Sequence, residues 1–292
     1  MQVITISNLK GGTGKTSIAI NLAAGLARRA GPQGEAVVLL DFDAQGNALK
    51  AVSGTTQYTN AESLAAAIAD DDLLELLGLP RPALAALVRP APESWYPNLH
   101  FIPCREMMLV EVRRRLPAIE NRVELMRAAI QSLEGRFGYV VIDTGPSIDD
   151  LLVTIFAATD YILVPVEMDE NAIEGAVRIA KKVGEVAGSS GRPHILGYVA
   201  NKYLGQRIGD RNAIVSLQQL FNGLLYESII PNSIDVRYSQ AARSDIYRYA
   251  PKSPAALALA LMVEETVQRV ARAAASAPGG AVRKDGQAVK TP

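Results

Sequence analysis

Short apolar runs alternate with stretches of helical spacing along residues 1–275. The runs are rich in Val, Ile and Leu, which is typical of strands buried on both faces of a sheet. Between them, apolar residues recur every three or four positions, as Ile18, Leu22 and Leu26 do, and this spacing predicts amphipathic helices. We therefore expect strands at 3–7, 36–40, 99–103, 139–143, 161–166, 195–201 and 228–230.

This alternation predicts one α/β domain over 1–275, built on a doubly wound, mostly parallel sheet with helices on both faces. Region 52–133 fits the pattern least well, because the five prolines of 80–97 read as a loop. Residues 276–292 are rich in Gly, Pro and Lys without periodicity, which predicts a disordered tail. Helices are expected at 18–29, 61–79, 109–116, 119–133, 172–186, 217–225 and 254–275, with one helix or two in 61–79.

The first strand leads into a glycine-rich turn, residues 8–17, and then into a helix. Glycines in such a turn let backbone N–H groups face inward around an anion, and the helix N-terminus adds partial positive charge. The Lys15 ammonium would pair with β- and γ-phosphate oxygens, and the Thr16 hydroxyl would ligate Mg²⁺. Strand, turn and helix together favour a phosphate-binding loop over a surface turn, with Gly11, Gly12, Thr13, Gly14, Lys15, Thr16 and Ser17 binding the nucleotide.

Two residues of this loop, Leu9 and Lys10, indicate which class of phosphate-binding loop it is. The general pattern G-x-x-x-x-G-K-[ST] has glycine where this chain has Leu9, and Lys10 lies inside the loop. The string K-G-G-T-G-K-T resembles the deviant Walker A motif of the ParA/MinD ATPases, which are P-loop NTPases. In that family the first lysine reaches across an ATP-sandwich homodimer to the partner's phosphates. The resemblance assigns this nucleotide-binding and catalytic role to Lys10, beside Lys15.

Carboxylates end two of the apolar runs. Asp41 and Asp43 follow 36–40, and Asp143 ends 139–143. Ligands bind at the carboxyl ends of strands in open α/β sheets, although a helix cap and turn is the alternative for the first pair. Asp143 matches the Walker B aspartate, which holds Mg²⁺ through water. The segment D-F-D-A-Q-G-N resembles the family's first switch, D-x-D-P-Q-G-N; this implies that Asp43 orients the attacking water and that Asp41 supports the Mg²⁺ shell.

Two later segments resemble the family's base-binding region. Asn201 ends an apolar run, and the family places an asparagine there against adenine; a polar strand end is the alternative. Pro231 and Asn232 resemble the start of the family's loop beside the base. The segment 144–147 resembles the second switch, with Gly145 in place of a proline. The resemblance covers Met1 to about Ala275 and implies ATP and Mg²⁺ as cofactors.

The net charge and the cysteine content limit which partners and cofactors the protein is expected to bind. The 30 basic and 30 acidic residues cancel, so no global field attracts nucleic acid and any DNA contact must be a local patch. The single Cys104 excludes a disulfide framework and an iron–sulfur cluster and fits a reducing cytosol. Ordinary solvated charges are the alternative for the candidate DNA contacts, which are Arg207, Arg211, Arg237, Arg243, Arg248 and Lys252.

The resemblance implies a ParA/Soj-type ATPase that dimerises on ATP and binds DNA without sequence preference. A ParB-like or other partner would stimulate its hydrolysis, and the cycle would position a chromosome, plasmid or protein cluster. No apolar run is long enough to span a membrane, and the first strand leaves no room for a signal peptide or a helix-turn-helix domain. We expect a cytoplasmic, nucleoid-associated protein without a stable membrane anchor. The alternatives are a MinD-like positioning or regulatory ATPase at a membrane or secretion assembly and, less favoured, a small-molecule P-loop kinase.

Overall fold

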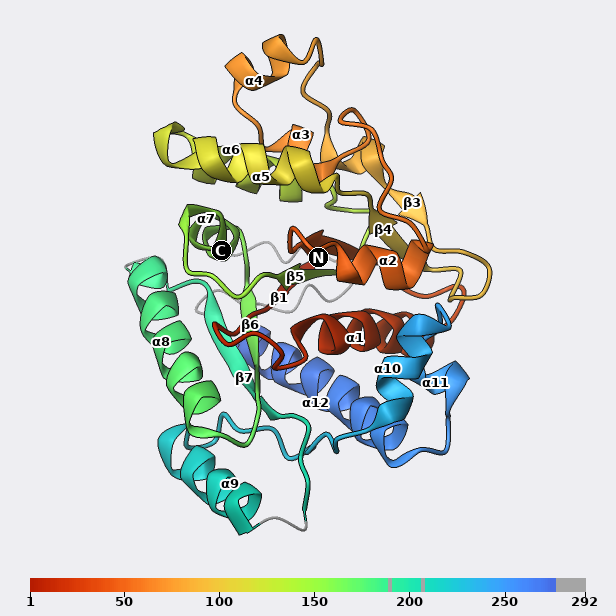
Figure 1. Ribbon diagram of the computed structural model, residues 1–292, viewed down its shortest axis with the longest axis vertical. Helices are drawn as coiled ribbons and strands as arrows, with labels where there is room; N and C mark the ends of the chain where they lie inside the picture. Colours follow the sequence, from red (N-terminus) through yellow and green to blue (C-terminus); the bar gives the residue numbers. More distant parts are fainter. Residues whose placement is uncertain (189–190, 206–207, 277–292) are drawn as a thin grey trace, which may run out of the picture.

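The computed structural model describes residues 1–188, 191–205 and 208–276, which form a central sheet between layers of helices (Figure 1). The sheet has seven strands in the order β3-β4-β2-β5-β1-β6-β7. All neighbouring pairs are parallel except the edge pair β3 and β4. The mostly parallel α/β fold is therefore confirmed, with β1 (Gln2–Ile6), β2 (Val37–Phe42), β3 (Arg89–Pro90), β4 (Leu99–Ile102), β5 (Tyr139–Thr144), β6 (Tyr161–Val166) and β7 (His194–Ala200).

Helices cover both faces of this sheet (Figure 1). On one face α1 (Lys15–Ala30) packs against α12 (Pro254–Ser276), and on the other α6 (Arg122–Gln131), α7 (Asp150–Ala157) and α8 (Glu170–Ala187) follow one another. The apolar positions that predicted α1 are buried against the sheet, as expected of an amphipathic helix. The remaining helices are α2 (Asn47–Ser53), α3 (Leu64–Ala67), α4 (Asp71–Leu76), α5 (Glu106–Arg115), α9 (Ile208–Leu220), α10 (Ile234–Ala241) and α11 (Ile246–Tyr249), with short 3₁₀ turns η1 (Leu84–Leu87) and η2 (Leu116–Ala118).

Region 52–133 differs most from expectation. The segment 61–79, expected as one helix or two, holds two short helices, α3 and α4, separated by the turn in which Asp70 caps α4. The proline-rich 80–97 segment holds η1 and the edge strand β3 as well as loop. Pro90 can sit in β3 because an edge strand need not donate every backbone N–H. The side chain of Trp95 is buried and anchors this segment to the core.

Three of the elements predicted near the C-terminus differ in the structure. The strand expected at 228–230 is absent; instead the Ile230 amide donates to the Ala200 carbonyl, and Tyr203 forms an isolated bridge with Pro231. The helix expected at 217–225 begins earlier, as α9. Ser276 ends α12, and the rest of the predicted tail, 277–292, lies outside the described residues.

Strand register brings the expected carboxylates together. Asp143 on β5 is aligned with Asp41 on β2 and with Ile6, the last residue of β1. The glycine-rich loop follows β1 directly, so it leaves the sheet next to both carboxylates. This is the carboxyl edge of a parallel sheet, where open α/β folds bind ligands. Within the described ranges, no helix is both long and apolar enough to cross a membrane.

Candidate nucleotide-binding site

The glycine-rich loop has a backbone that only glycine adopts easily. Gly12 and Gly14 have φ angles of 84° and 87°, in the left-handed region. Gly14 also begins α1 as its N-cap, and a Cβ there would lie 2.3 Å from the amide nitrogen of Asn201. Both the φ angle and this close approach therefore require glycine at position 14.

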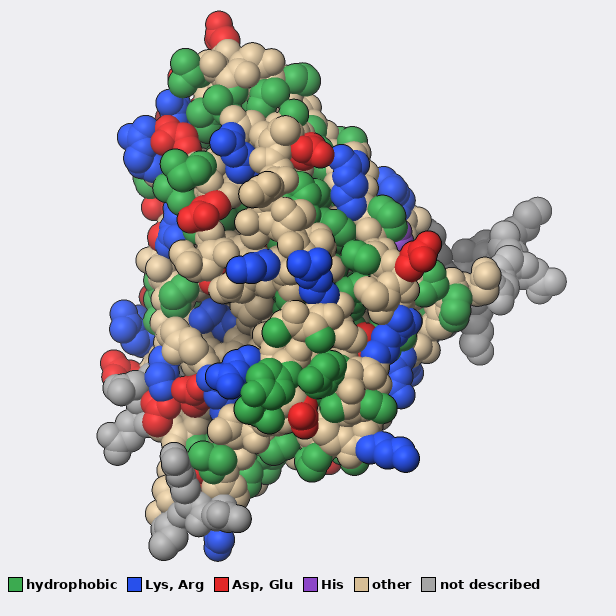
Figure 2. Space-filling model, turned by 45° about the vertical axis from the view of Figure 1, so that its right-hand side comes forward, with side chains coloured by type: hydrophobic (Ala, Val, Ile, Leu, Met, Phe, Trp, Pro, Cys, Tyr) green, Lys and Arg blue, Asp and Glu red, His purple; other side chains and the backbone are tan. Residues whose placement is uncertain are grey.

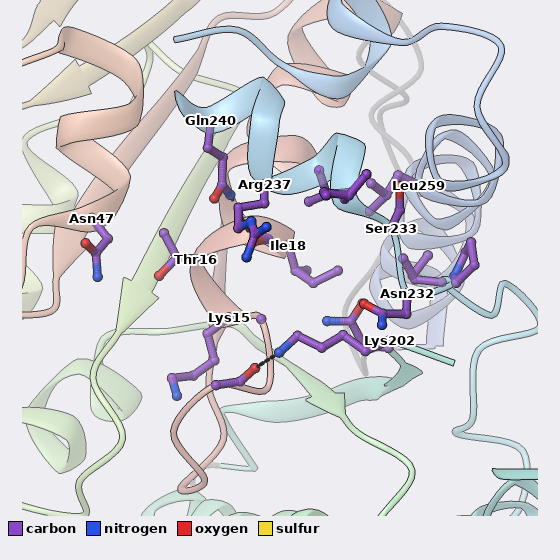
Figure 3. A pocket seen from close by; sticks show the side chains of 18 of the residues that line it. Lys15, Thr16, Ile18, Asn47, Lys202, Asn232, Ser233, Arg237, Gln240 and Leu259 are labelled. Carbon is purple, nitrogen blue, oxygen red and sulfur yellow. Dashed lines mark hydrogen bonds between the residues drawn. The ribbon is translucent and has the colours of Figure 1, made fainter. Parts of the chain in front are cut away.

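Asn201 and Lys202 hold this loop from the end of β7. The Asn201 Nδ2 donates to the Thr13 carbonyl at 2.7 Å, and the Lys202 ammonium donates to the Gly12 carbonyl (Figure 3). The buried amide nitrogen of Asn201 contacts the loop itself, and its place against adenine stays a prediction. Its observed contribution is to fix the shape of the phosphate-binding backbone.

Substitution of Gly14 tests this backbone requirement. We expect Gly14→Ala to lower the free energy of unfolding by about 1–2 kcal/mol, the cost of a left-handed alanine, and by more if Asn201 is displaced. Gly11→Ala is the matched control, since its φ is ordinary and an added Cβ would meet no atom within 4 Å. Urea unfolding without nucleotide measures both; equal stability of the two variants would contradict the argument.

Lys15 lies inside the loop with only 7% of its surface exposed. Its Nζ donates to the Lys10 carbonyl at 3.1 Å. Burial lowers the pKa of Lys15, and the nearby carboxylates of Asp143 and Asp43 oppose this change. A buried ammonium that forms no ion pair with the described residues is costly, and an entering phosphate would provide the missing charge.

The Asp143 carboxylate has the surroundings expected of a group that serves a metal. Both of its oxygens are buried and accept no hydrogen bond in the described part of the chain. Burial raises the pKa of Asp143, the neighbouring Asp41 charge raises it further, and the Thr16 hydroxyl opposes the rise. A buried carboxylate without partners beside a hydroxyl fits Mg²⁺ held by Thr16, by water and by nucleotide phosphates.

Asp41 has different contacts from those expected of a residue that supports a metal shell. Its Oδ1 accepts the Asp43 amide at 3.0 Å, and its Oδ2 accepts the amides of Ala48 and Leu49 at 2.9 and 3.1 Å. Burial raises its pKa, and these backbone donors oppose the increase. In the structure Asp41 therefore holds the start of α2 and the turn that carries Asp43, and its support of the Mg²⁺ shell stays a prediction.

Asp43 faces a cavity of about 740 Å³, a size typical of small-molecule sites. Its Oδ1 accepts the Gln45 amide at 3.0 Å, which orders the turn and leaves Oδ2 available. The cavity lies between the carboxyl edge of the sheet and the segment that leads into α10 (Figure 3). Among its lining residues are Gly11, Gly12, Gly14, Lys15, Thr16, Ser17, Asn47, Pro146, Asn201, Lys202, Pro231, Asn232, Arg237 and Gln240.

Lys10 pairs with carboxylates of its own chain. Its Nζ contacts Glu167 at 2.8 Å and also Asp169, and Glu167 binds Lys202 at 2.7 Å through its other oxygen. Partial burial lowers the pKa of Lys10, but hydrogen bonds to Asp169 and Glu167 outweigh it and raise the pKa overall. The sequence analysis missed Glu167 and Asp169, although they follow β6 as Asp43 follows β2.

The candidate DNA contacts that the structure describes lie on separate parts of the monomer, and their joining into one patch in a dimer stays a prediction. Arg237 lines the nucleotide cavity, whereas Arg211 lies on α9, away from α10 in Figure 1, and its Nε donates to the Gly205 carbonyl. Arg248 has a structural role, since its guanidinium lies 4.3 Å from the ring centroid of Tyr96 and also pairs with Asp245. Arg243 and Lys252 are exposed, and Arg207 lies outside the described residues.

Comparison with known proteins agrees with this geometry. A family model described as an AAA domain matches residues 1–193. The chromosome-partitioning ATPase Soj of Thermus thermophilus is 29% identical over 276 residues, covering 92% of this chain and 97% of that protein. The chromosome partitioning protein ParA of Caulobacter vibrioides is 28% identical over 277 residues, covering 92% and 95%. The solved structure of apo McdA from Cyanothece has the same fold, with a TM-score of 0.77, 20% identity, and coverage of 91% and 99%.

Proposed function

The chain belongs to the AAA domain family and is of the ParA/MinD type, and we propose from this that it is an Mg²⁺-dependent ATPase that positions cargo on DNA. The observation that carries the proposal is the buried Lys15 ammonium, which lines the cavity and forms no ion pair with a described residue, close to the buried Asp143 carboxylate, which accepts no hydrogen bond in the described part of the chain. An Mg·ATP complex would provide a counter-charge for both groups. Its anionic phosphates would pair with the Lys15 ammonium, and its Mg²⁺ would offset the charge of the Asp143 carboxylate.

Different residues are proposed to bind the phosphates, hold Mg²⁺, orient the attacking water and border the base. Lys15 and the loop amides would bind the phosphates, while Thr16 and Asp143 would hold Mg²⁺, which neutralises charge on the phosphate oxygens. Asp43, which also lines the cavity, would orient the attacking water. Pro231 and Asn232, further lining residues, would border the base. An assay of ATP hydrolysis with and without Mg²⁺ tests the proposed metal requirement.

The ATP-bound form is proposed to be a homodimer in which Lys10 serves the partner's phosphates. In the monomer the Lys10 ammonium is held by Glu167 and Asp169, so it would have to leave these carboxylates on dimerisation. Soj and ParA are named for chromosome partitioning, and this chain is proposed to do equivalent work on the nucleoid with a partner that stimulates hydrolysis.

Removal of the Lys10 side chain should separate ATP binding from assembly. We expect Lys10→Ala to bind ATP as a monomer, because Lys15 contacts the backbone carbonyl of residue 10 and this bond survives the substitution. Light scattering with ATP measures the mass, and Lys181→Ala on α8 is the control for charge. ATP-dependent dimers of Lys10→Ala would contradict the cross-dimer role.

DNA binding is tested directly by a mobility shift with mixed-sequence duplex at low salt, with and without ATP. We expect a shift only with ATP, because a neutral monomer gains little from long-range attraction while a dimer doubles any local patch. Flotation with anionic liposomes in parallel separates DNA from a membrane surface. Flotation without a DNA shift would replace the DNA proposal with the MinD-like alternative.

A further inference from the structure

A second cavity, of about 440 Å³, lies beside the nucleotide cavity between α2 and α10. Thr16, Arg237 and Gln240 border both cavities, so the two share a wall at the start of α1. Lys and Arg side chains lie around the middle of the face shown in Figure 2. The second cavity is lined by exposed residues together with Thr16, so it is open to solvent beside the proposed metal-binding threonine.

The charge around this cavity is of one sign. Lys50, Arg237 and Arg243 line it, and no Asp or Glu is among the described residues that do so. All three cations are exposed, and none forms an ion pair with a described residue, in contrast to Arg113 and Arg269, which pair with carboxylates. Converging cations without a counter-charge repel one another, and an anion among them removes that repulsion.

The position of Arg243 is fixed by unusual backbone. Arg243 has a φ of 55°, in the left-handed region that non-glycine residues rarely adopt. Its guanidinium lies over Gly54, where a Cβ would come within 2.6 Å of the guanidinium carbon. Gly54 caps the C-terminal end of α2, and the partial negative charge there favours a cation. The left-handed Arg243 follows the C-cap of α10, where the Ser244 amide donates to the Ser239 carbonyl.

We propose that this cavity binds a phosphodiester of the nucleic-acid backbone, held between Lys50 of α2 and Arg243 beyond α10. The proposal rests on the proposed DNA-binding function and gives it a location. Exposed cations around an open cavity suit a phosphate on a polymer, because the rest of the duplex stays outside. Contacts of this kind carry no sequence information, which fits binding without sequence preference.

The helices α2 and α10, which enclose the second cavity, also contact the nucleotide site. α2 carries Asn47, which lines the nucleotide cavity, and α10 carries Gln240, whose amide donates to the Ser17 hydroxyl at 2.9 Å. A phosphate bound by Lys50 and Arg243 would fix both elements around Thr16. DNA and ATP should then strengthen each other's binding by the same factor, as linkage requires.

The test compares two double variants that remove the same charge. Lys50→Gln with Arg243→Gln removes the two cavity cations that do not line the nucleotide site, and Lys181→Gln with Arg178→Gln removes exposed cations of α8. Duplex affinity is measured with a non-hydrolysable ATP analogue at about 50–200 mM salt. For the cavity variant we expect an affinity loss of at least roughly tenfold at low salt and a salt slope reduced by about two. The α8 variant should bind like wild type.

Each outcome decides a different question. If the cavity variant and the α8 variant bind DNA equally well, the cavity proposal is overturned while DNA binding stands. If wild type binds no DNA with any nucleotide, the proposed function fails and the cavity proposal fails with it. A thermal shift with inorganic phosphate separates the sources: stabilisation of wild type but not of the cavity variant, with equal DNA affinities, would assign the cavity to free phosphate instead. Lys50→Gln alone, at an exposed helical position, repeats the test should the double variant not fold.

Discussion

Lys15→Ala is expected to abolish ATP binding, with an affinity loss of at least about a hundredfold. The Lys15 ammonium is the buried cation of the phosphate loop, and charge-assisted bonds to phosphate are among the strongest that a side chain makes. Titration of a fluorescent ATP analogue measures the loss. Lys202, the other lysine at the cavity, already pairs with Glu167 and cannot take over this place without leaving it.

The expected effect of Lys15→Ala on thermal stability is small, in contrast to its large expected effect on ATP affinity. Without nucleotide, we expect Lys15→Ala to unfold at nearly the same temperature as wild type, because it removes a buried charge that lacks a carboxylate partner among the described residues. Thermal unfolding with and without ATP measures this, and ATP should stabilise only the wild type. Lys181→Ala is again the control. ATP affinity within a few-fold of wild type would refute the role of Lys15.

Asp43→Ala is expected to stop hydrolysis while ATP still binds. Orientation of water acts mainly in the transition state and typically contributes 10²- to 10⁴-fold, so turnover should fall by about that factor. The protein should then accumulate in its ATP-bound form, and the McdA structure with ATP bound was obtained with an aspartate-to-alanine variant of that protein. Turnover and ATP affinity, measured on the same preparation, separate the two steps.

Asp43→Asn is the matched variant for this prediction. Its side-chain oxygen can still accept the Gln45 amide, so the turn is retained while the negative charge is lost. If the charge orients water, both variants should lose turnover equally. Normal hydrolysis in Asp43→Asn with loss only in Asp43→Ala would show that the turn, and not the carboxylate, matters.

Local sequence determined the strands and the phosphate loop. Buried parallel strands must be apolar on both faces, so the runs at β1, β2, β5 and β6 are visible without any knowledge of the fold. The loop is equally local, since its glycines, lysine and threonine act within ten consecutive residues. Asp143 could be found for the same reason, as a carboxylate at the end of such a run.

Only the tertiary structure decided which side chains meet around the loop. Lys10 pairs with Glu167, 157 residues away, and Asn201 binds Thr13, 188 residues away. Such pairs arise because crossovers bring the ends of β1, β6 and β7 to one edge, and no periodicity records that order. The same holds for Asp41, whose Oδ2 accepts two amides of α2. It also holds for Lys50 and Arg243, which converge at a cavity only because α2 and α10 pack side by side.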